Sequence, residues 1–359
     1  MGFPVEFQVQ GTDFFKKVMG LRYVKSDRLL ILAKSNKLYA GFQEPQAIAW
    51  LQYGESKLKK FSPISLNCTN FLNICKHQKQ LNFTGDSKLD AVASTAKFSA
   101  RNIPIEDWSP DIEYLKFEAP KQTGLHKAFL KILRKVLPLA IAVDVTVKSI
   151  QIMHTNKTLM VTSLAETGSL GYVGIWQLDS KWDEYFTKEN LGTWLLPIEA
   201  ALAFLDEESS MFYSAGKTFV YGENYHMIFN QFGEAKPPET FLSLLDNKPE
   251  LRFTLNFEKF FELLNQLPMG KTIELSYKKA KVLNIEASGY SKISVQTKIK
   301  NVKGKPGKIT LNHRQLKQII GKVKEFSGMV EWSHFIKIVC HTDVFTHHWL
   351  LGRSYDDSK

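Results

Sequence analysis

A short sequence motif occurs three times in this chain and limits the folds that the chain can adopt. It is Ile-Ser-Leu-Asn at residues 64–67, Phe-Thr-Leu-Asn at 253–256 and Ile-Thr-Leu-Asn at 309–312. The alternating apolar residues predict the end of a strand. The asparagine is a favoured helix N-cap, because its side-chain oxygen accepts a hydrogen bond from a free amide of the first turn. The motif therefore predicts strands that pass directly into helices, and its repetition predicts an internal repeat.

The helix predicted after Asn312 has two chemically different sides. Its apolar residues share one face at helical spacing: Leu316, Ile319, Ile320, Val323 and Phe326. The basic residues on the opposite face are Arg314, Lys317 and Lys324. Such a pattern is typical of a helix with one side in the core and the other in solvent.

A second helix, predicted to begin near Thr123, is the most cationic of the chain. Its core stripe is Leu125, Phe129, Ile132, Leu133 and Val136, and its opposite side carries Lys127, Lys131, Arg134 and Lys135. Four more helices are predicted to start at Thr12 or Asp13, Asn67, Pro197 and Asn256. Two of these are not basic, because one is predicted to turn Ala200, Ala203 and Glu207 outward, and the other Glu258 and Glu262.

The six helices form three pairs that recur at intervals of about 120 residues, with alternating apolar and polar segments between them. Alternation is typical of antiparallel sheets with one covered face. We therefore predict an α+β fold of three tandem domains, at residues 1–120, 121–248 and 249–359, with helices gathered on one side of the sheets.

The charge balance favours an anionic partner. The chain has 47 Lys and Arg against 36 Asp and Glu, a net charge of +11, which indicates a polyanion such as nucleic acid, although a merely soluble basic protein has the same balance. No apolar run approaches the roughly 20 residues that cross a bilayer, and no signal segment is evident, so we expect a soluble intracellular protein. The three cysteines are expected to be reduced thiols.

Three motif-like segments do not support an enzyme. Gly270-Lys271-Thr272 resembles the end of a phosphate-binding loop but lacks the first glycine. The possible metal ligands near the C-terminus, Cys340, His341, Asp343, His347 and His348, are expected to straddle a turn and to be scattered over two faces. The basic turn Gly304-Lys-Pro-Gly-Lys308 is expected to be a solvated hairpin. We expect no catalytic residue, no metal and no cofactor.

With these helix pairs and the linking segment at residues 241–256, the chain resembles the bacterial sliding clamp, the β subunit of DNA polymerase III. The resemblance implies a non-enzymatic processivity factor: a homodimeric ring of six domains, with sheets outside and two helices per domain lining a hole around duplex DNA. It also implies phosphate contacts that carry no sequence information, a loader, and a tethered polymerase, in a bacterial cytoplasm or a phage-infected cell. A clamp-like protein-interaction scaffold or transcription cofactor with incidental basic charge is the alternative.

The resemblance assigns two sets of residues. The expected DNA-binding residues are Lys16, Arg22, Lys127, Lys131, Arg134, Lys135, Arg314, Lys317 and Lys324; solvation of surface helices would explain the same residues. The expected groove for partner peptides is formed by Leu159, Val161, Leu245, Trp349, Leu350 and Leu351; a plain core would also contain them. Residues 162–166 and 349–355 replace the family's motifs there, which indicates a divergent phage or viral member with different partner peptides.

Overall fold

The computed structural model describes residues 5–24, 26–55, 60–85, 88–92, 97–101, 127–141, 147–155, 157–165, 170–178, 193–206, 209–214, 216–231, 233–278, 281–288 and 292–354. It divides the chain into two compact units. The first comprises Met1–His126 and Glu199–Phe232, and the second Lys127–Ile198 and Gly233–Lys359. Each unit contains antiparallel sheets and helices, so the predicted α+β class is confirmed.

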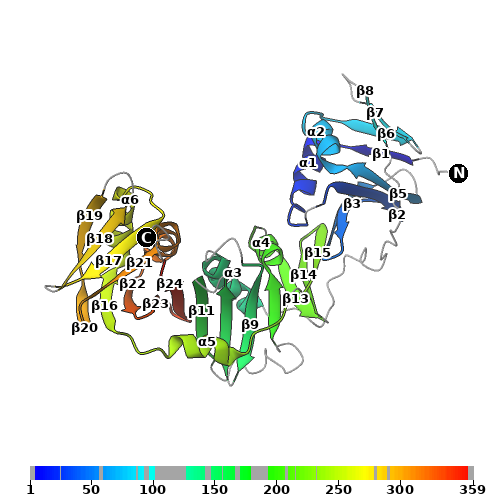
Figure 1. Cartoon of the computed structure of the whole chain (residues 1–359). Helices are drawn as coiled ribbons and strands as arrows, with labels where there is room; N and C mark the ends of the chain where they lie inside the picture. Colours follow the sequence, from blue (N-terminus) through cyan, green and yellow to red (C-terminus); the bar gives the residue numbers. More distant parts are fainter. Residues whose placement is uncertain are drawn as a thin grey trace. The chain divides into compact units, whose positions relative to one another are not determined.

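The first unit contains two antiparallel sheets, ordered β1-β6-β7-β8 and β13-β14-β15-β4-β3-β2-β5 (Figure 1). Its strands are β1 (Val5–Val9), β2 (Arg28–Lys34), β3 (Lys37–Glu44), β4 (Ala47–Glu55), β5 (Lys60–Asn67), β6 (Leu81–Gly85), β7 (Lys88–Val92), β8 (Lys97–Arg101), β13 (Ser210–Ser214), β14 (Lys217–Tyr221) and β15 (Tyr225–Asn230). Its helices are α1 (Gly11–Met19), α2 (Cys68–Lys76) and nearly all of α4 (Ile198–Asp206).

Strand β2 is buried on both faces, which explains its nearly continuous apolar sequence. On one face Leu30 and Leu32 pack with Tyr39 and Trp50. Gly41 of β3 lies opposite Trp50 of β4, and a methyl group on Gly41 would lie 2.6 Å from the Trp50 ring. The close approach of β3 and β4 therefore requires glycine at this position.

Helices α1 and α2 lie side by side and share an aromatic core (Figure 1). Phe14 of α1 meets Phe71 of α2 edge to face at 6.0 Å between ring centroids, and Phe71 meets Phe83 of β6 at 5.2 Å. The prediction that Thr12 or Asp13 caps α1 is wrong, because the N-cap is Gln10, whose side chain makes no capping hydrogen bond. The first-turn amides of Gly11 and Thr12 instead donate to carbonyls that follow α2, so no polar side chain is needed.

The second unit contains a sheet ordered β12-β9-β10-β11-β24-β23-β22-β16-β20 and another ordered β19-β18-β17-β21. Its strands are β9 (Ser149–Thr155), β10 (Thr158–Leu164), β11 (Leu170–Gln177), β12 (Trp194–Pro197), β16 (Leu251–Asn256), β17 (Thr272–Tyr277), β18 (Val282–Ser288), β19 (Lys292–Lys298), β20 (Lys300–Gly304), β21 (Gly307–Asn312), β22 (Ser327–Trp332), β23 (Phe335–His341) and β24 (Thr346–Gly352). Its helices are α3 (Lys127–Ile141), α5 (Pro238–Leu245), α6 (Phe257–Gln266) and α7 (His313–Val323).

The three predicted asparagine caps are confirmed. The side chain of Asn67 accepts from the amide of Asn70 at 3.0 Å, that of Asn256 from Lys259 at 2.9 Å, and that of Asn312 from Gln315 at 3.0 Å. These residues end β5, β16 and β21 and begin α2, α6 and α7. The recurring motif therefore marks three strand-to-helix junctions of the same kind.

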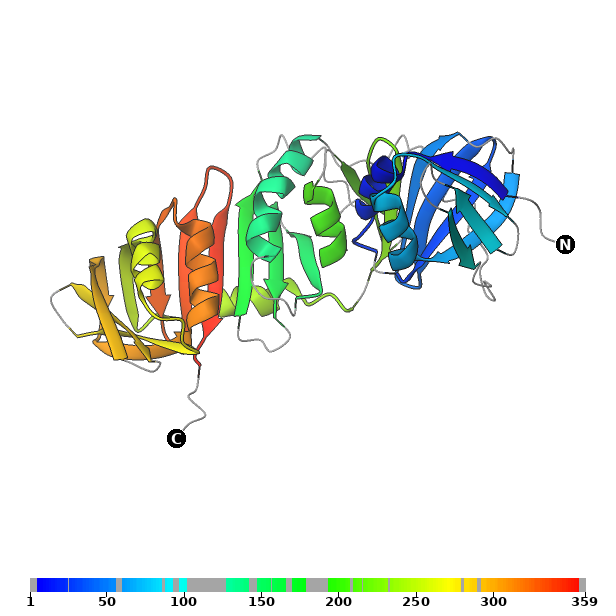
Figure 2. The ribbon, with the colours of Figure 1, turned by 90° about the horizontal axis from the view of Figure 1, so that it is seen from above.

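Helices α6 and α7 lie side by side over the strands of the second unit (Figure 2). The predicted core face of α7 is confirmed, since Leu316, Ile319, Ile320 and Val323 are all buried. A methyl group on Gly321 would lie 3.0 Å from the ring of Phe261, so glycine allows the two helices to approach closely.

Candidate nucleic-acid interface

Helix α7 exposes positive charge on the side away from its core. Arg314 and Lys324 are exposed, while Lys317 is half-buried with its Nζ 4.0 Å from the Met269 sulfur. The Lys324 ammonium also lies 5.8 Å from the centre of the Phe261 ring. Lys322 is exposed in the last turn and is a basic residue that the sequence analysis did not single out, although its position could have been found from the helical spacing.

Helix α3 carries basic residues and no acid. Of the predicted core stripe, Phe129, Leu133 and Val136 are buried and Ile132 is half-buried, while Leu125 lies outside the described residues. Lys131 and Lys135 are exposed. Arg134 is half-buried, so it is less available than its neighbours. Lys127 begins the helix, but its side chain lies outside the described residues, as does the predicted start near residue 123.

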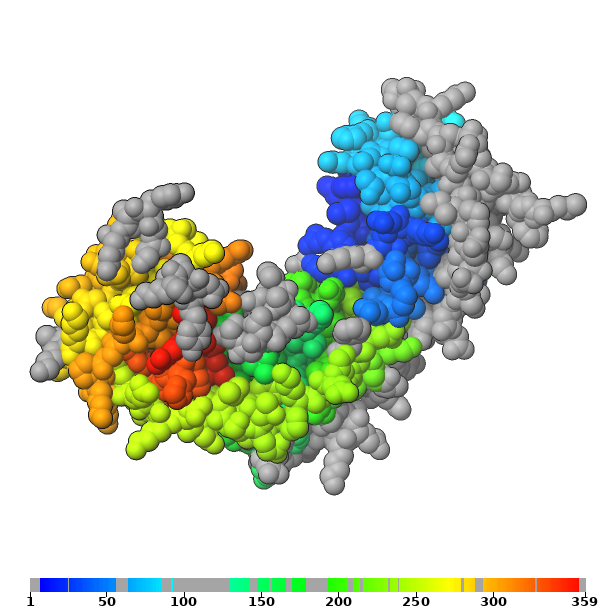
Figure 3. Space-filling model, in the orientation of Figure 1, coloured from blue at the N-terminus to red at the C-terminus, as the bar shows by residue number. Residues whose placement is uncertain are grey.

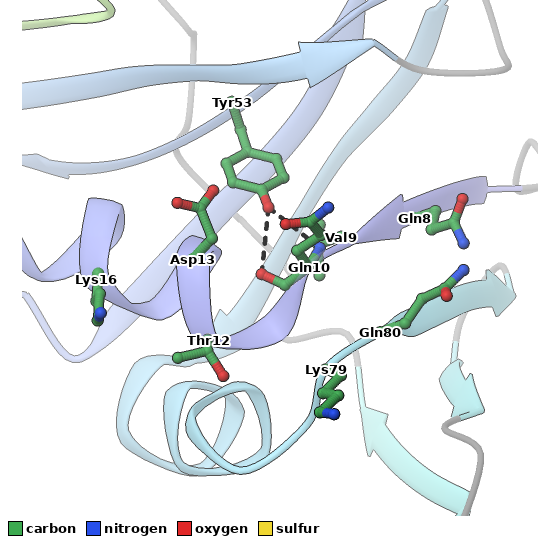
Figure 4. A pocket seen from close by; sticks show the side chains of 9 residues that line it. All are labelled: Gln8, Val9, Gln10, Thr12, Asp13, Lys16, Tyr53, Lys79 and Gln80. Carbon is green, nitrogen blue, oxygen red and sulfur yellow. Dashed lines mark hydrogen bonds between the residues drawn. The ribbon is translucent and has the colours of Figure 1, made fainter.

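In α1, Lys16 is exposed and lies at a hollow of about 920 Å³ (Figure 4). The hollow is lined by Gln8, Val9, Gln10, Thr12, Asp13, Lys16, Tyr53, Lys79 and Gln80. The Tyr53 hydroxyl accepts from the Gln10 amide at 3.1 Å and donates to the Gln10 carbonyl at 3.2 Å. Burial, as the main cause, raises the pKa of Tyr53 to about 12, so the phenol stays protonated and this link persists at neutral pH.

Arg22 follows α1 and is exposed, with its guanidinium 3.0 Å from the Tyr23 hydroxyl. By contrast, Lys17 forms an ion pair with Asp13 at 3.2 Å, one turn earlier in the same helix. The two basic residues that the sequence analysis singled out here, Lys16 and Arg22, are therefore both at the surface.

Helices α6 and α4 are not cationic. Helix α6 exposes Glu258, Lys259 and Glu262, as predicted. The predicted outward side of α4 is wrong, because Ala200 and Ala203 are buried, with 0% and 2% of their surfaces exposed; Glu207 lies outside the described residues. Only Glu199 and Asp206 of α4 are charged, so no broad polar face indicates how this helix is oriented.

The histidines near the C-terminus take part in the packing of β24. His347 is buried, and its Nδ1 lies 2.8 Å from the Tyr172 hydroxyl. Burial lowers the pKa of His347 to about 4 and raises that of Tyr172 well above 10, so both groups are neutral at pH 7 and share one hydrogen bond. His348 follows on the opposite face of the strand. In the part of the chain that the structure describes, no three potential metal-binding side chains come together.

The residues predicted for a partner groove divide between two faces of one sheet. In the registers of β10, β11 and β24, Leu159, Val161, Trp349 and Leu351 share the face that α3 covers, and all are buried. Leu350 and Leu245 lie on the other face, where α5 packs. There Phe241 contacts Met153, Met160 and Val173, and Leu245 packs against the same cluster.

Helix α5 is anchored to this second face by a buried lysine. The Lys337 ammonium donates to the Leu245 carbonyl at 2.7 Å and forms an ion pair with Glu331, which also pairs with Arg252. Lys337 and Leu350 are opposite each other on β23 and β24. Figure 3 shows α5, in yellow-green, beside the red strand β24 on the visible face of this unit. Leu242, 39% exposed, is the large apolar residue that α5 leaves at the surface.

Comparisons with known proteins find the same fold in solved structures. A putative DNA polymerase III β subunit from Eubacterium rectale superposes with a TM-score of 0.77 at 12% identity, covering 98% of this chain and 100% of that one. The β subunit from Pseudomonas aeruginosa gives 0.75 at 12%, and that from Thermotoga maritima 0.75 at 8%, with the same coverage. The chain has the fold of the bacterial sliding clamp.

This clamp fold is carried by a very different sequence. No protein-family model matches the chain, and no curated protein matches it. At 8–12% identity over nearly the whole chain, the feature that is shared is the fold. Among the described residues, no helix is long and apolar enough to cross a membrane.

Proposed function

We propose that this chain is a DNA polymerase processivity clamp, a non-enzymatic ring that encircles duplex DNA in a bacterial or phage-infected cytoplasm. The observation that carries the proposal is the clamp fold over 98% of the chain, combined with the cationic outer sides of α3 and α7. Two of the solved structures with this fold are DNA polymerase sliding clamps, from Pseudomonas aeruginosa and Bacillus subtilis.

The order of elements supports three domains, with boundaries near residues 120 and 248. The first would run β1-α1-β2-β3-β4-β5-α2-β6-β7-β8, and the third repeats this order from β16 to β24 with β20 inserted. The middle set, from α3 to β15, follows the same order from the first helix onward. Each domain would then supply two helices.

Strand pairing supports a ring of two chains. Inside the chain, the strand equivalent to β4 of one domain pairs with the last strand of the next: β4 with β15, and β11 with β24. By the same rule, β19 of the third domain would pair with β8 of a second copy. Core-facing residues of β19 are accordingly incompletely covered, since Ile293 remains 39% exposed, whereas the equivalent strand β11 is almost fully buried. Two such joins would close a homodimer.

The basic helix faces would contact the DNA backbone. Lys16, Arg22, Lys131, Lys135, Arg314 and Lys324 are exposed and would attract phosphates irrespective of base sequence. Arg134 and Lys317, which are half-buried, and Lys127 complete the proposed set. Because phosphate contacts are alike at every register, such a ring would slide along the duplex.

The decisive experiment compares retention on circular and linear duplex DNA. A closed ring placed on a nicked circle should stay bound through gel filtration in 0.2–0.5 M salt and should be lost once the circle is cut. A protein that binds the side of DNA would behave alike on both forms, and this result would refute the proposal. Lys131→Glu with Lys135→Glu should reduce loading without reducing thermal stability, because both side chains are exposed.

We further propose that polymerase and loader peptides dock between α5 and β24. Leu242, Leu245 and Leu350 would contact the peptide, while the other four predicted residues would support the sheet beneath. The Lys337 link to the Leu245 carbonyl would hold α5 in place.

Peptides selected on immobilised protein can test this groove. Leu242→Glu should abolish binding of such peptides by placing a charge on the apolar contact, whereas Glu239→Gln, on the same helix, should leave binding unchanged. Unchanged binding to the Leu242→Glu variant would place the docking surface elsewhere.

A further inference from the structure

The two strands proposed to close the ring carry positive charge and no acid, and the following inference rests on that proposed closure. Strand β8 contains Lys97 and Arg101, and β19 contains Lys292 and Lys298. The joins inside the chain are different: no Lys, Arg, Asp or Glu occurs among the paired residues of β4 with β15 or of β11 with β24. The closing join therefore has a chemistry of its own.

The internal joins predict the register of the closing one. In each internal join, the last strand of one domain (β15 or β24) pairs with the second strand of a hairpin in the preceding domain (β4 or β11). The fifth residue of β15 or β24 lies opposite the first residue of β4 or β11 that pairs across that hairpin. Phe229 lies opposite Ala47, and Leu350 opposite Gly171. In β19 that first hairpin position is Lys292, opposite Ser288, and the fifth residue of β8 is Arg101.

This register separates apolar from charged positions. It sets Phe98 opposite Val295 and Ala100 opposite Ile293, on the side where Val295 and Ile293 neighbour the core residues Ile285 and Ala287. These pairs would cover the apolar residues that β19 leaves exposed. The attraction across the join would therefore be apolar.

On the other side of the same join, like charges come together. Arg101 falls opposite Lys292, and Lys97 falls diagonal to Lys298, positions at which like charges oppose strand pairing. One strand further out on each side lie Asp90 and Glu286, with Lys88 beside Arg101. At these register positions basic residues outnumber acidic ones by five to two, so the net charge at the join is positive.

We infer that the ring of this protein is closed by apolar strand pairing against electrostatic repulsion, so that salt strengthens the dimer. Screening reduces the repulsion between exposed charges as ionic strength rises. A homodimer contains two identical joins, so the effect on dissociation is doubled in free energy. The ring would open most readily at low ionic strength.

Sedimentation velocity of the full chain at 50 and 500 mM NaCl tests the inference directly. The dimer dissociation constant should fall by about tenfold between the two concentrations. Lys292→Glu with Lys298→Glu should tighten the dimer at 50 mM NaCl and reverse its salt dependence. Lys271→Glu with Lys278→Glu is the matched control, because it makes the same change in net charge at exposed positions that flank β17, outside the join.

The outcomes separate the inference from the proposed ring. A wild-type dimer that weakens with salt would overturn the repulsive join while leaving the ring intact. A permanent monomer at every salt concentration would overturn the ring itself. Equal effects of the two double variants would show that overall charge, and not the join, controls assembly. If the first double variant does not fold, the wild-type salt series still decides.

Discussion

Helices α6 and α7 start in the same way and pack together, but they expose opposite charges. Each follows a strand, is capped by asparagine and buries its first residue, Phe257 in α6 and His313 in α7. Outward, α6 exposes Glu258 and Glu262, while α7 exposes Arg314, Lys322 and Lys324. The comparison teaches that the fold determines the inner faces of these helices, and that their outer faces were free to acquire different functions.

The largest effect should come from the shared inner faces. Ile320→Ala in α7 and Leu264→Ala in α6 should each lower the free energy of unfolding by about 2–5 kcal/mol, since both side chains are fully buried. Chemical denaturation measures the change. A loss of stability in only one of the two variants would show that the two helices do not share one core.

Substitutions on the outer faces of α6 and α7 should have different effects on DNA binding. Arg314→Glu with Lys324→Glu should weaken binding to linear duplex about tenfold at low salt and lower the salt slope by about 2, since two phosphate contacts are lost. Fluorescence anisotropy across a salt series measures both quantities.

The matched change on α6 is Glu258→Gln with Glu262→Gln, which should strengthen binding by a few-fold. Both double variants change exposed side chains and should keep stability within about 0.5 kcal/mol of the parent. Equal effects on DNA affinity from α6 and α7, in the same direction, would contradict the contrast between them.

Substitution of the two asparagine caps should affect α6 and α7 alike. Asn312→Ala and Asn256→Ala should each cost about 1 kcal/mol, because each removes one hydrogen bond to a first-turn amide, at 3.0 and 2.9 Å. Thermal unfolding of the two variants should therefore show similar shifts. Asn312→Asp should retain most of the stability.

The smallest expected effect is a pH dependence of stability that α7 has and α6 lacks. Burial, and then the charge of Lys317, lower the pKa of His313 below its usual 6.5, so folding favours the neutral imidazole. Its contribution to stability is present above pH 6.5 and is lost as pH falls through the lowered pKa. His313→Phe, which copies Phe257, should flatten the stability profile between pH 7 and 5. An unchanged slope would assign that pH dependence to other groups, such as His347.

Much of this fold follows from local chemistry in the sequence. The asparagine caps, the core stripes of α3 and α7 and the alternating strands need only helix and strand periodicity, and each is found where those periodicities predict it. The exposed charge of Lys131 and Arg314 follows in the same way, because a long cationic side chain opposite a core stripe is left in solvent.

Tertiary structure decided what depends on contacts between distant segments. The start of α1 is satisfied by carbonyls after α2, the sides of α4 are both apolar, and Leu159 and Leu245 lie on opposite faces of one sheet. None of these features has a local signal, because each depends on which segment covers which face. The sequence by itself determined where α2, α6 and α7 begin and which way the charged sides of α3 and α7 point, since those are short-range effects. The pairing of β11 with β24, and the edge that β19 leaves open, were decided by packing across the whole chain.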